Sequence, residues 1–313
     1  MTEKQKMLER DDEFSQENWC LAPLTTLLTS FKIFQRNLKL FSSIFALTTL
    51  PLSLLLCSLS LSSHPMMSQI YHLEALAMVA PTRFEARQVL KQSREEALSL
   101  LRLKALYFVP CYVLSLIATV MAVSSTAVSL SGKRASLSTA VTAVKATWRR
   151  PLVTSICVYA IMLVCIQVPR MLAALLSTAA LRLPAAVAGA VLEVYLMAVV
   201  SLGLVVSIVE ERVGLDAVWA GSDLMEGRKF CGWVLSGLLV VVSGAISGEI
   251  KRSTDGEDSS RAEWTVAMGL GNKAGMICLF GLVVVWSYVV TTVFYSECRK
   301  RHVTSEHIDY GTV

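Results

Sequence analysis

Few residues in this sequence have types and spacings that could carry out chemistry. The chain has four histidines among its 313 residues, and none stands at a metal-binding spacing from a cysteine or a carboxylate. It has no glycine-rich phosphate loop, no Cys-x-x-Cys pair and no hydrolase signature. The sequence therefore predicts no metal, no cofactor and no catalytic residue, and we expect a protein that is not an enzyme.

Glu193 is the residue best suited to a functional role. It interrupts the apolar run AVAGAVLEVYLMAVV, and hydrocarbon penalises an ionisable side chain unless it finds a partner or a cavity. Arg170 and Gln167 lie in the preceding apolar run. Glu193 is eight residues into its predicted helix, about 12 Å at 1.5 Å per residue, so Arg170 is within reach. An ion pair that locks two helices is the structural interpretation; a substrate or proton pathway is the functional one.

Cys298 has a setting typical of lipid modification. It directly precedes Arg299, Lys300 and Arg301 at the end of an apolar run. A juxtamembrane cysteine beside basic residues suits palmitoylation and binding of anionic lipid. The alternative is an unmodified juxtamembrane thiol.

The composition places these residues in a membrane protein. The chain is 54% hydrophobic and 17% charged, with a formal net charge of +5 and a mean hydropathy of +0.56. Soluble domains carry about 25% charged residues, and disorder requires low hydrophobicity with high net charge. We therefore expect the lipid bilayer as partner, with no nucleic acid.

Six apolar blocks are long enough to cross a bilayer, which takes about 20 residues each. The predicted spans are residues 40–62, 105–130, 152–176, 185–209, 230–248 and 274–296. Residues 1–20 are predicted to be a disordered cytosolic N-terminus, 21–298 a single membrane domain, and 299–313 a cytosolic tail. The fold class is thus an all-α, multi-pass transmembrane bundle of six spans in three hairpins.

The basic residues predict the orientation of the spans. With six spans, both termini and the segments 131–151 and 210–229 share one side, and that side carries 17 of the 29 basic residues. Lys and Arg favour the cytosolic side, so both termini are predicted to be cytosolic. The expected basic anchors at this interface are Arg36, Arg149, Arg150, Arg228 and Lys229.

A threefold repeat precedes the first, third and fifth spans. The three leads read LTTLLTSFKIFQRN, LSTAVTAVKATWRR and LDAVWAGSDLMEGRK. Each ends in a polar or basic pair just before an apolar run, and the first two place apolar residues at spacings of three and four, typical of one face of a helix. We expect each repeat to be a cytosolic amphipathic interfacial helix followed by a helical hairpin. The alternative is that any helix entering a membrane has a basic flank.

Two resemblances agree with this architecture. The segment VVSIVEERVGLDAVWAGSDLMEGRKFCGW resembles a pattern in bacterial multi-pass proteins related to the membrane domain of glycerophosphoryl diester phosphodiesterase, through Glu211, Gly214, Ala217, Ser222, Leu224 and Gly227. FKIFQRNLKLFSSIFALTTLPLSLLLCSLSLSSHP and VFYSECRKRH resemble a plant family of uncharacterised six-span membrane proteins. The resemblance implies a multi-pass membrane architecture, and it transfers no active site.

Together these features favour a non-enzymatic protein of the endomembrane system or plasma membrane, which acts as a scaffold, organises lipid or assists trafficking. Its expected partners are the bilayer, anionic headgroups on the cytosolic side and other membrane proteins. The alternative is a transporter or channel with a polar path near Glu193. Such proteins carry several polar or interrupted helices at mid-membrane, whereas Glu193 is the conspicuous case here.

Overall fold

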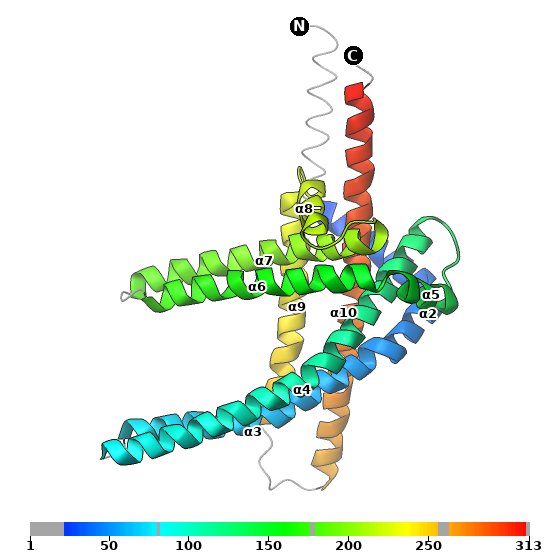
Figure 1. Ribbon diagram of the computed structural model, residues 1–313. Helices are drawn as coiled ribbons and strands as arrows, with labels where there is room; N and C mark the ends of the chain where they lie inside the picture. Colours follow the sequence, from blue (N-terminus) through cyan, green and yellow to red (C-terminus); the bar gives the residue numbers. More distant parts are fainter. Residues whose placement is uncertain (1–21, 80–81, 176–178, 256–262, 311–313) are drawn as a thin grey trace. The chain divides into compact units, whose positions relative to one another are not determined.

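The protein is built from helices. The computed structural model describes residues 22–79, 82–175, 179–255 and 263–310, and the first helix of this part covers residues 22–36. The elements that follow are α2 (Leu38–Ile44), the π-helical turn η1 (Phe45–Thr49), α3 (Leu50–Val79), α4 (Arg83–Leu130), α5 (Leu137–Thr147), α6 (Arg149–Leu175), α7 (Ala179–Val209), α8 (Leu215–Leu224), α9 (Lys229–Asp255) and α10 (Glu263–Tyr310) (Figure 1). The predicted N-terminal disorder at 1–20 lies outside the described residues.

Six helices in the described part are long and apolar enough to cross a membrane. They cover Leu38–Val79, Arg83–Leu130, Arg149–Val168, Leu183–Val209, Lys229–Ile250 and Ala274–His302. The all-helical class is therefore confirmed, and the composition of the helices indicates a membrane location. A helix satisfies all its backbone hydrogen bonds internally, which is why such apolar segments fold this way in lipid.

Several helices continue well beyond the predicted spans. The first predicted span ended at residue 62, but α3 continues to Val79; the sixth ended at 296, but α10 continues to Tyr310. α4 has 48 residues, about 72 Å at 1.5 Å per residue, against about 30 Å of hydrocarbon. The predicted bounds refer to the crossing of the membrane, and a helix can continue past it where the polar residues are good helix formers, as in TRFEARQVLKQSREEALSLLRLK before the second span.

The first span contains a local irregularity beside a proline. The π-helical turn η1 ends at Thr49, and Pro51 is the second residue of α3. Proline has no backbone N–H and its ring clashes with the carbonyl four residues earlier, so the helix before it must adjust. A single π turn provides this adjustment without ending the helix.

Each of the three predicted leads is a helix separated from its span by a turn. The first, residues 22–36, ends at a turn at Asn37; α5 ends at a turn at Trp148; and α8 ends at a turn over residues 225–227. The breaks fall within one residue of the polar or basic pairs of the repeat. In α5 the Ser136 hydroxyl caps the N-terminus, since it accepts a hydrogen bond from the Thr139 amide at 3.3 Å.

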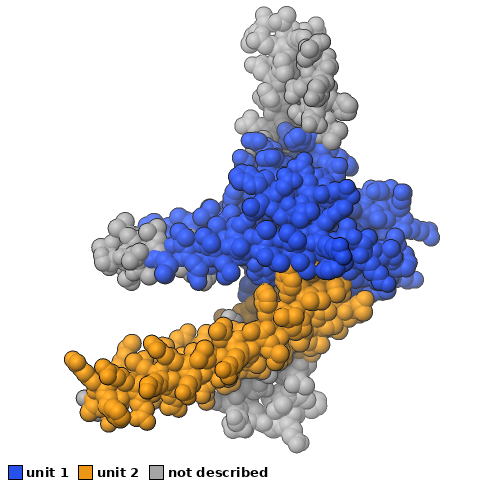
Figure 2. Space-filling model, in the orientation of Figure 1, with its two compact units in different colours: residues 1–44, 119–245, 283–313 blue, residues 45–118, 246–282 orange. Residues whose placement is uncertain are grey.

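The chain divides into two compact units (Figure 2). Unit 1 comprises residues 1–44, 119–245 and 283–313, and unit 2 comprises residues 45–118 and 246–282. The core of unit 1 is formed by fully buried residues of α4, α7, α8, α9 and α10, among them Val120, Leu202, Val206, Ala217 and Val290. This core fixes the ends of the helices that carry the charged residues described below.

Within unit 1, α7 contacts both α6 and α8, and Figure 1 shows α6 and α7 running alongside each other. The contact between α7 and α8 is close because both helices place glycine there. A Cβ atom on Gly221 would lie 2.8 Å from the Gly203 amide nitrogen, and one on Gly203 would lie 2.9 Å from the Val218 Cα. Ala217 and Ala220 continue the same small-residue face of α8 and are buried.

Candidate functional site

The predicted intramembrane site is only partly described. Glu193 is half-buried on α7, and Gln167 is exposed on α6. The side chain of Arg170 lies outside the described residues, so the Arg170–Glu193 ion pair stays a prediction. Among the described side chains, no hydrogen bond or ion pair to Glu193 is present. The contact between α6 and α7 does keep the helices that carry these residues adjacent.

The predicted basic anchors have different surroundings. Arg36 donates from Nη2 to the Ser129 carbonyl at 3.1 Å, which joins the first lead to the end of α4. The Arg149 guanidinium lies 5.6 Å from the centre of the Trp148 ring, a cation–π distance. Lys229 is exposed at the start of α9. Arg36 therefore binds another part of the protein, whereas Arg149 and Trp148 form a pair of the kind found in the headgroup region of a membrane.

The start of α6 contacts the segment between α7 and α8 through Arg150 and Glu211. Arg150 Nη2 lies 2.9 Å from Glu211 Oε1, and the Glu211 side chain is largely exposed. A second contact lies beside this pair. The buried Gly214 amide donates a hydrogen bond to the Thr154 hydroxyl at 2.9 Å. Gly214 has a φ of +67°, a conformation that glycine adopts without strain. Two residues of the bacterial-like motif, Glu211 and Gly214, thus hold the start of α6.

Arg228 is paired with a carboxylate far away in the sequence. Its Nη1 donates to Glu297 Oε2 at 3.0 Å, and both side chains are 27% exposed. The same carboxylate oxygen accepts a hydrogen bond from Thr26 Oγ1 at 2.8 Å, and Thr26 is fully buried in the first lead. Glu297 therefore joins the first lead, the residue that precedes α9, and α10. We call Thr26, Arg228 and Glu297 the Glu297 clamp.

A second carboxylate, Glu210, is held in the same way. Tyr295 donates its hydroxyl to Glu210 Oε1 at 2.6 Å. Arg299 Nη1 donates to the Tyr295 hydroxyl at 2.8 Å and lies 3.4 Å from Glu210 Oε1. Arg212 Nε lies 3.7 Å from Glu210 Oε2. Glu210, Tyr295 and Arg299, the Glu210 clamp, join the end of α7 to α10.

These contacts connect the segments that the basic residues assign to one side of the membrane. Thr26–Glu297 joins the first lead to the end of α10, and Arg36–Ser129 joins it to the end of α4. Arg150–Glu211 joins the 131–151 segment to the 210–229 segment, which Arg228–Glu297 and Tyr295–Glu210 join to the end of α10. All of these residues belong to unit 1. Three carboxylates at this end of unit 1, those of Glu210, Glu211 and Glu297, are therefore each paired with an arginine.

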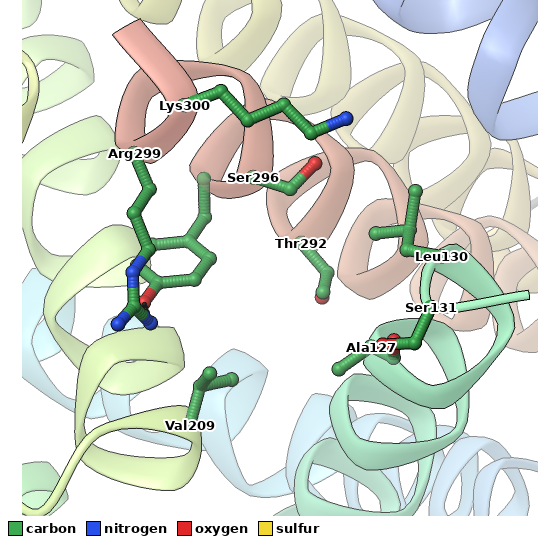
Figure 3. Close-up of a pocket in the computed structure, with 9 residues that line it drawn as sticks. Ala127, Leu130, Ser131, Val209, Thr292, Ser296, Arg299 and Lys300 are labelled. Carbon is green, nitrogen blue, oxygen red and sulfur yellow. Dashed lines mark hydrogen bonds between the residues drawn. The ribbon is translucent and has the colours of Figure 1, made fainter. Parts of the chain in front are cut away.

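A cavity of about 650 Å³ lies next to the Glu210 clamp (Figure 3). Its lining residues come from the ends of three helices: Ala127, Leu130 and Ser131 at the end of α4, Val209 at the end of α7, and Thr292, Tyr295, Ser296, Arg299 and Lys300 on α10. Figure 3 shows Arg299 on one side of the opening, Leu130, Ala127 and Ser131 on the opposite side, and the Lys300 side chain extending across the top. The cavity thus has apolar walls and a basic edge.

Cys298 is buried, with 3% of its surface exposed, and packs in the core of unit 1. It also lines a second cavity, of about 410 Å³, together with Asp223, Leu224, Glu226, Arg228, Arg301 and His302. In this conformation the thiol is shielded from an acylating enzyme, which favours the alternative of an unmodified cysteine. Nowhere in the described ranges do three or more His, Cys, Asp or Glu side chains gather in a way that could hold a metal ion.

The sequence similarity extends over almost the entire chain. A family model described as a domain of unknown function (DUF8558) matches residues 12–312. The chain belongs to the DUF8558 family. No curated protein and no solved structure shows significant similarity to it. The DUF8558 domain includes both units, both clamps and both cavities, so these features belong to one family domain.

The residues at the centre of the clamps were not predicted from the sequence. Glu210 and Glu297 are acids at the ends of apolar runs, on the side where the DUF8558 domain is otherwise rich in basic residues. An acid in such a position is a signal for a partner, because an unpaired carboxylate at the membrane surface gains little from anionic headgroups. Thr26 and Tyr295 carried no recognisable signal.

Proposed function

We propose that the protein is a non-enzymatic multi-pass membrane scaffold, which organises lipid or assists the trafficking of other membrane proteins. The observation that carries this proposal is the pairing of charges at one end of unit 1. Glu210 and Glu297 are each bound by an arginine and a hydroxyl. Side chains that pair with one another in this way hold the helices in a fixed arrangement, and they are not arranged around a substrate.

The proposed architecture has three repeats, each with an interfacial helix and a hairpin. The first lead supports this, because it buries Thr26 and Ser30 while it exposes Leu24, Leu28 and Phe31. A helix in water would present the opposite arrangement. Lipid at the interface accounts for exposed apolar side chains, and helix contacts within membranes favour small residues and hydroxyls.

We further propose that both termini lie in the cytosol, with the membrane in the endomembrane system or at the cell surface. The contacts among the four segments assigned to one side support this topology, since segments on opposite sides of a bilayer could not touch. An odd number of spans would separate the first lead from the end of α10, and the Thr26–Glu297 hydrogen bond would then be impossible.

The second candidate function is a transporter or channel that uses Glu193. The observation in its favour is that Glu193 is half-buried in an apolar run, and no hydrogen bond or ion pair to it is present among the described side chains. An intramembrane acid without a fixed partner is suited to a proton or substrate pathway. Against it, neither of the two cavities described above is lined by Glu193.

Proximity labelling in native membranes tests the scaffold. The wild-type chain is expected to label a reproducible set of membrane proteins, and Arg228→Gln, which opens the Glu297 clamp, is expected to lose part of that set at equal abundance. Arg252→Gln is the matched control, because among the described side chains Arg252 pairs only with Glu249, an exposed residue one turn earlier in the same helix. Labelling no different from that of an unrelated membrane protein, together with Glu193-dependent flux in liposomes, would favour the transporter.

A further inference from the structure

A third cavity, of about 310 Å³, lies in unit 2 between α3, α9 and α10. Its polar groups are serine hydroxyls, among them those of Ser60 on α3 and Ser247 on α9. We propose that this cavity binds the hydroxyl end of one uncharged lipid, a sterol or a diacylglycerol. This inference rests on the proposed membrane topology, and it deepens the proposed role in organising lipid because it specifies a ligand class and its binding residues. Nothing in the family description assigns a ligand.

The hydroxyls of Ser60 and Ser247 are available to a ligand. A serine within a helix commonly donates to a carbonyl of the preceding turn of its own helix. Three other serines of α3 do this at 2.9–3.1 Å: Ser53, Ser58 and Ser63. The hydroxyls of Ser60 and Ser247 line the cavity instead, and neither makes a hydrogen bond within the described part of the chain. An unpaired hydroxyl away from water costs free energy, so a ligand that pairs with both groups is favoured.

A single hydroxyl group on a ligand can pair with both serines. A hydroxyl carries one donor and two acceptor lone pairs, so it can donate to Ser60 and accept from Ser247, or the reverse. A hydrocarbon chain can do neither. Because the two serines belong to different helices, a ligand bound in this way also connects α3 to α9.

The lining of the cavity favours an uncharged ligand. No Lys, Arg, Asp or Glu is present among the lining residues that the structure describes. Lipid phosphates are bound by basic side chains, and a charge without a partner is penalised in hydrocarbon. Glu249, which is close to this wall in sequence, does not line the cavity and pairs with Arg252 at 2.8 Å. A phospholipid headgroup therefore has no partner here.

The remaining walls suit the apolar body of the lipid. Ile277 and Phe280 of α10 face the cavity. Next to Phe280, α10 approaches α3 closely, because a Cβ on Gly281 would lie 3.3 Å from Ser53 Oγ. The two helices thus meet at one end of the cavity, where Ser53 and Phe280 line it. The cavity is at the lower end of the range for ligand sites, about 300–1,000 Å³, and is partly open, so the rest of the lipid extends into the bilayer.

The depth of the cavity suits a lipid hydroxyl. In the six-span topology the first and fifth spans end on the non-cytosolic side, where the sixth begins. Ser60 and Ser247 lie close to the ends of the first and fifth predicted spans, and Ile277 lies close to the start of the sixth. Three segments therefore place the cavity at one level, just inside the non-cytosolic surface. At that level a lipid hydroxyl remains near the headgroups while its apolar body lies in hydrocarbon.

Equilibrium binding to the full-length, delipidated protein in detergent tests the proposal. The probes are tritiated cholesterol and tritiated dioleoylglycerol. The competitors are the same unlabelled lipids, phosphatidylcholine, and cholestane, which has the sterol rings but no hydroxyl group. We expect saturable binding at one site, displaced by the unlabelled probe and not by cholestane or phosphatidylcholine. Binding of cholesterol identifies a sterol site, and binding of dioleoylglycerol identifies a diacylglycerol site. Equal displacement by cholestane or by phosphatidylcholine, or no saturable binding of either probe, would overturn the proposal.

Serine variants locate the hydroxyl contacts. Ser60→Ala and Ser247→Ala are each expected to weaken binding by about three- to tenfold, the effect of one hydrogen bond between neutral groups. Ser58→Ala is the matched control, because its hydroxyl donates to the Leu55 carbonyl and the residue does not line the cavity; it should leave binding unchanged. Unchanged binding in both Ser60→Ala and Ser247→Ala, or equal weakening by Ser58→Ala, would contradict the assigned contacts.

A second pair of variants tests the location of the site. Ser247→Phe is expected to fill the cavity and abolish saturable binding, whereas Val241→Phe, at an exposed position on the same helix, should retain it. Saturable binding that survives Ser247→Phe would overturn the proposed location. Absence of lipid binding in a chain that keeps its proximity-labelling partners would refute this inference alone and leave the scaffold proposal intact. Loss of the partners with lipid binding retained would refute the scaffold alone.

Discussion

The contact between α7 and α8 makes a sharp prediction for Gly221→Ala. The new Cβ would lie 2.8 Å from the Gly203 amide nitrogen and 3.1 Å from the Gly203 Cα. Both atoms are backbone, so no side-chain rotation relieves the clash and one helix must move. Overpacking of this kind costs about 1–3 kcal/mol, and the better helix propensity of alanine returns up to about 1 kcal/mol. We therefore expect a net destabilisation of about 1–2 kcal/mol.

Thermal unfolding in detergent, followed by tryptophan fluorescence, measures this effect. Each 1 kcal/mol lowers the midpoint by about 2–4 °C in a chain of this order of size, so the expected decrease is about 2–8 °C. Gly244→Ala is the control, because a Cβ there meets nothing within 4 Å, and its midpoint should stay the same or rise. If Gly221→Ala proved as stable as the wild type, the close approach of α7 and α8 would be refuted.

Three further predictions follow from individual residues. In a double-mutant cycle on Arg228→Gln and Glu297→Gln, the unfolding free energies should show a coupling of about 1–2 kcal/mol, between the values for exposed and buried pairs; additive effects would argue against the Glu297 clamp. In detergent, with the modified cysteines identified by peptide mass spectrometry, maleimide should leave buried Cys298 unmodified until the chain unfolds, and rapid modification of Cys298 in the folded protein would mean that the end of α10 opens readily. Glu193→Gln should preserve abundance and the proximity-labelling partners if Glu193 is structural, whereas loss of the partners at unchanged abundance would assign it a functional role.

The fold class was predictable because the physics leaves few alternatives. An apolar run of about 20 residues can satisfy its backbone in lipid only as a helix or in a closed barrel, and the runs here have no strand-like alternation. The lead helices were also visible, since the spacings of three and four in 22–36 and in α5 identify a helix without tertiary information. The extensions of α3 to Val79 and of α10 to Tyr310 were not predicted, because hydropathy marks where a helix leaves the apolar layer and not where the helix ends.

The clamps could not be predicted for a different reason. Thr26 and Glu297 are 271 residues apart, and Arg228 and Glu297 are 69 apart. A sequence pattern reports local geometry, and only packing of the unit 1 core decides which charged ends meet. The same holds for Gly203 and Gly221, whose contact depends on the turn at Gly214 that reverses the chain between α7 and α8. The basic anchors were identified by type, but the partners of Arg36, Arg150 and Arg228 required the structure.

The most direct test of the proposed six-span arrangement is to measure from which face of the membrane individual residues are accessible. Single cysteines replace exposed Lys133, Asp223 or Arg87 in a chain whose native cysteines are removed, and a membrane-impermeant maleimide is applied to sealed vesicles of known orientation. Residues 133 and 223 should react from the cytosolic face, and residue 87 from the opposite face. Reaction of residues 133 and 223 from different faces, or of residues 133 and 87 from the same face, would contradict the six-span arrangement and its paired cytosolic end.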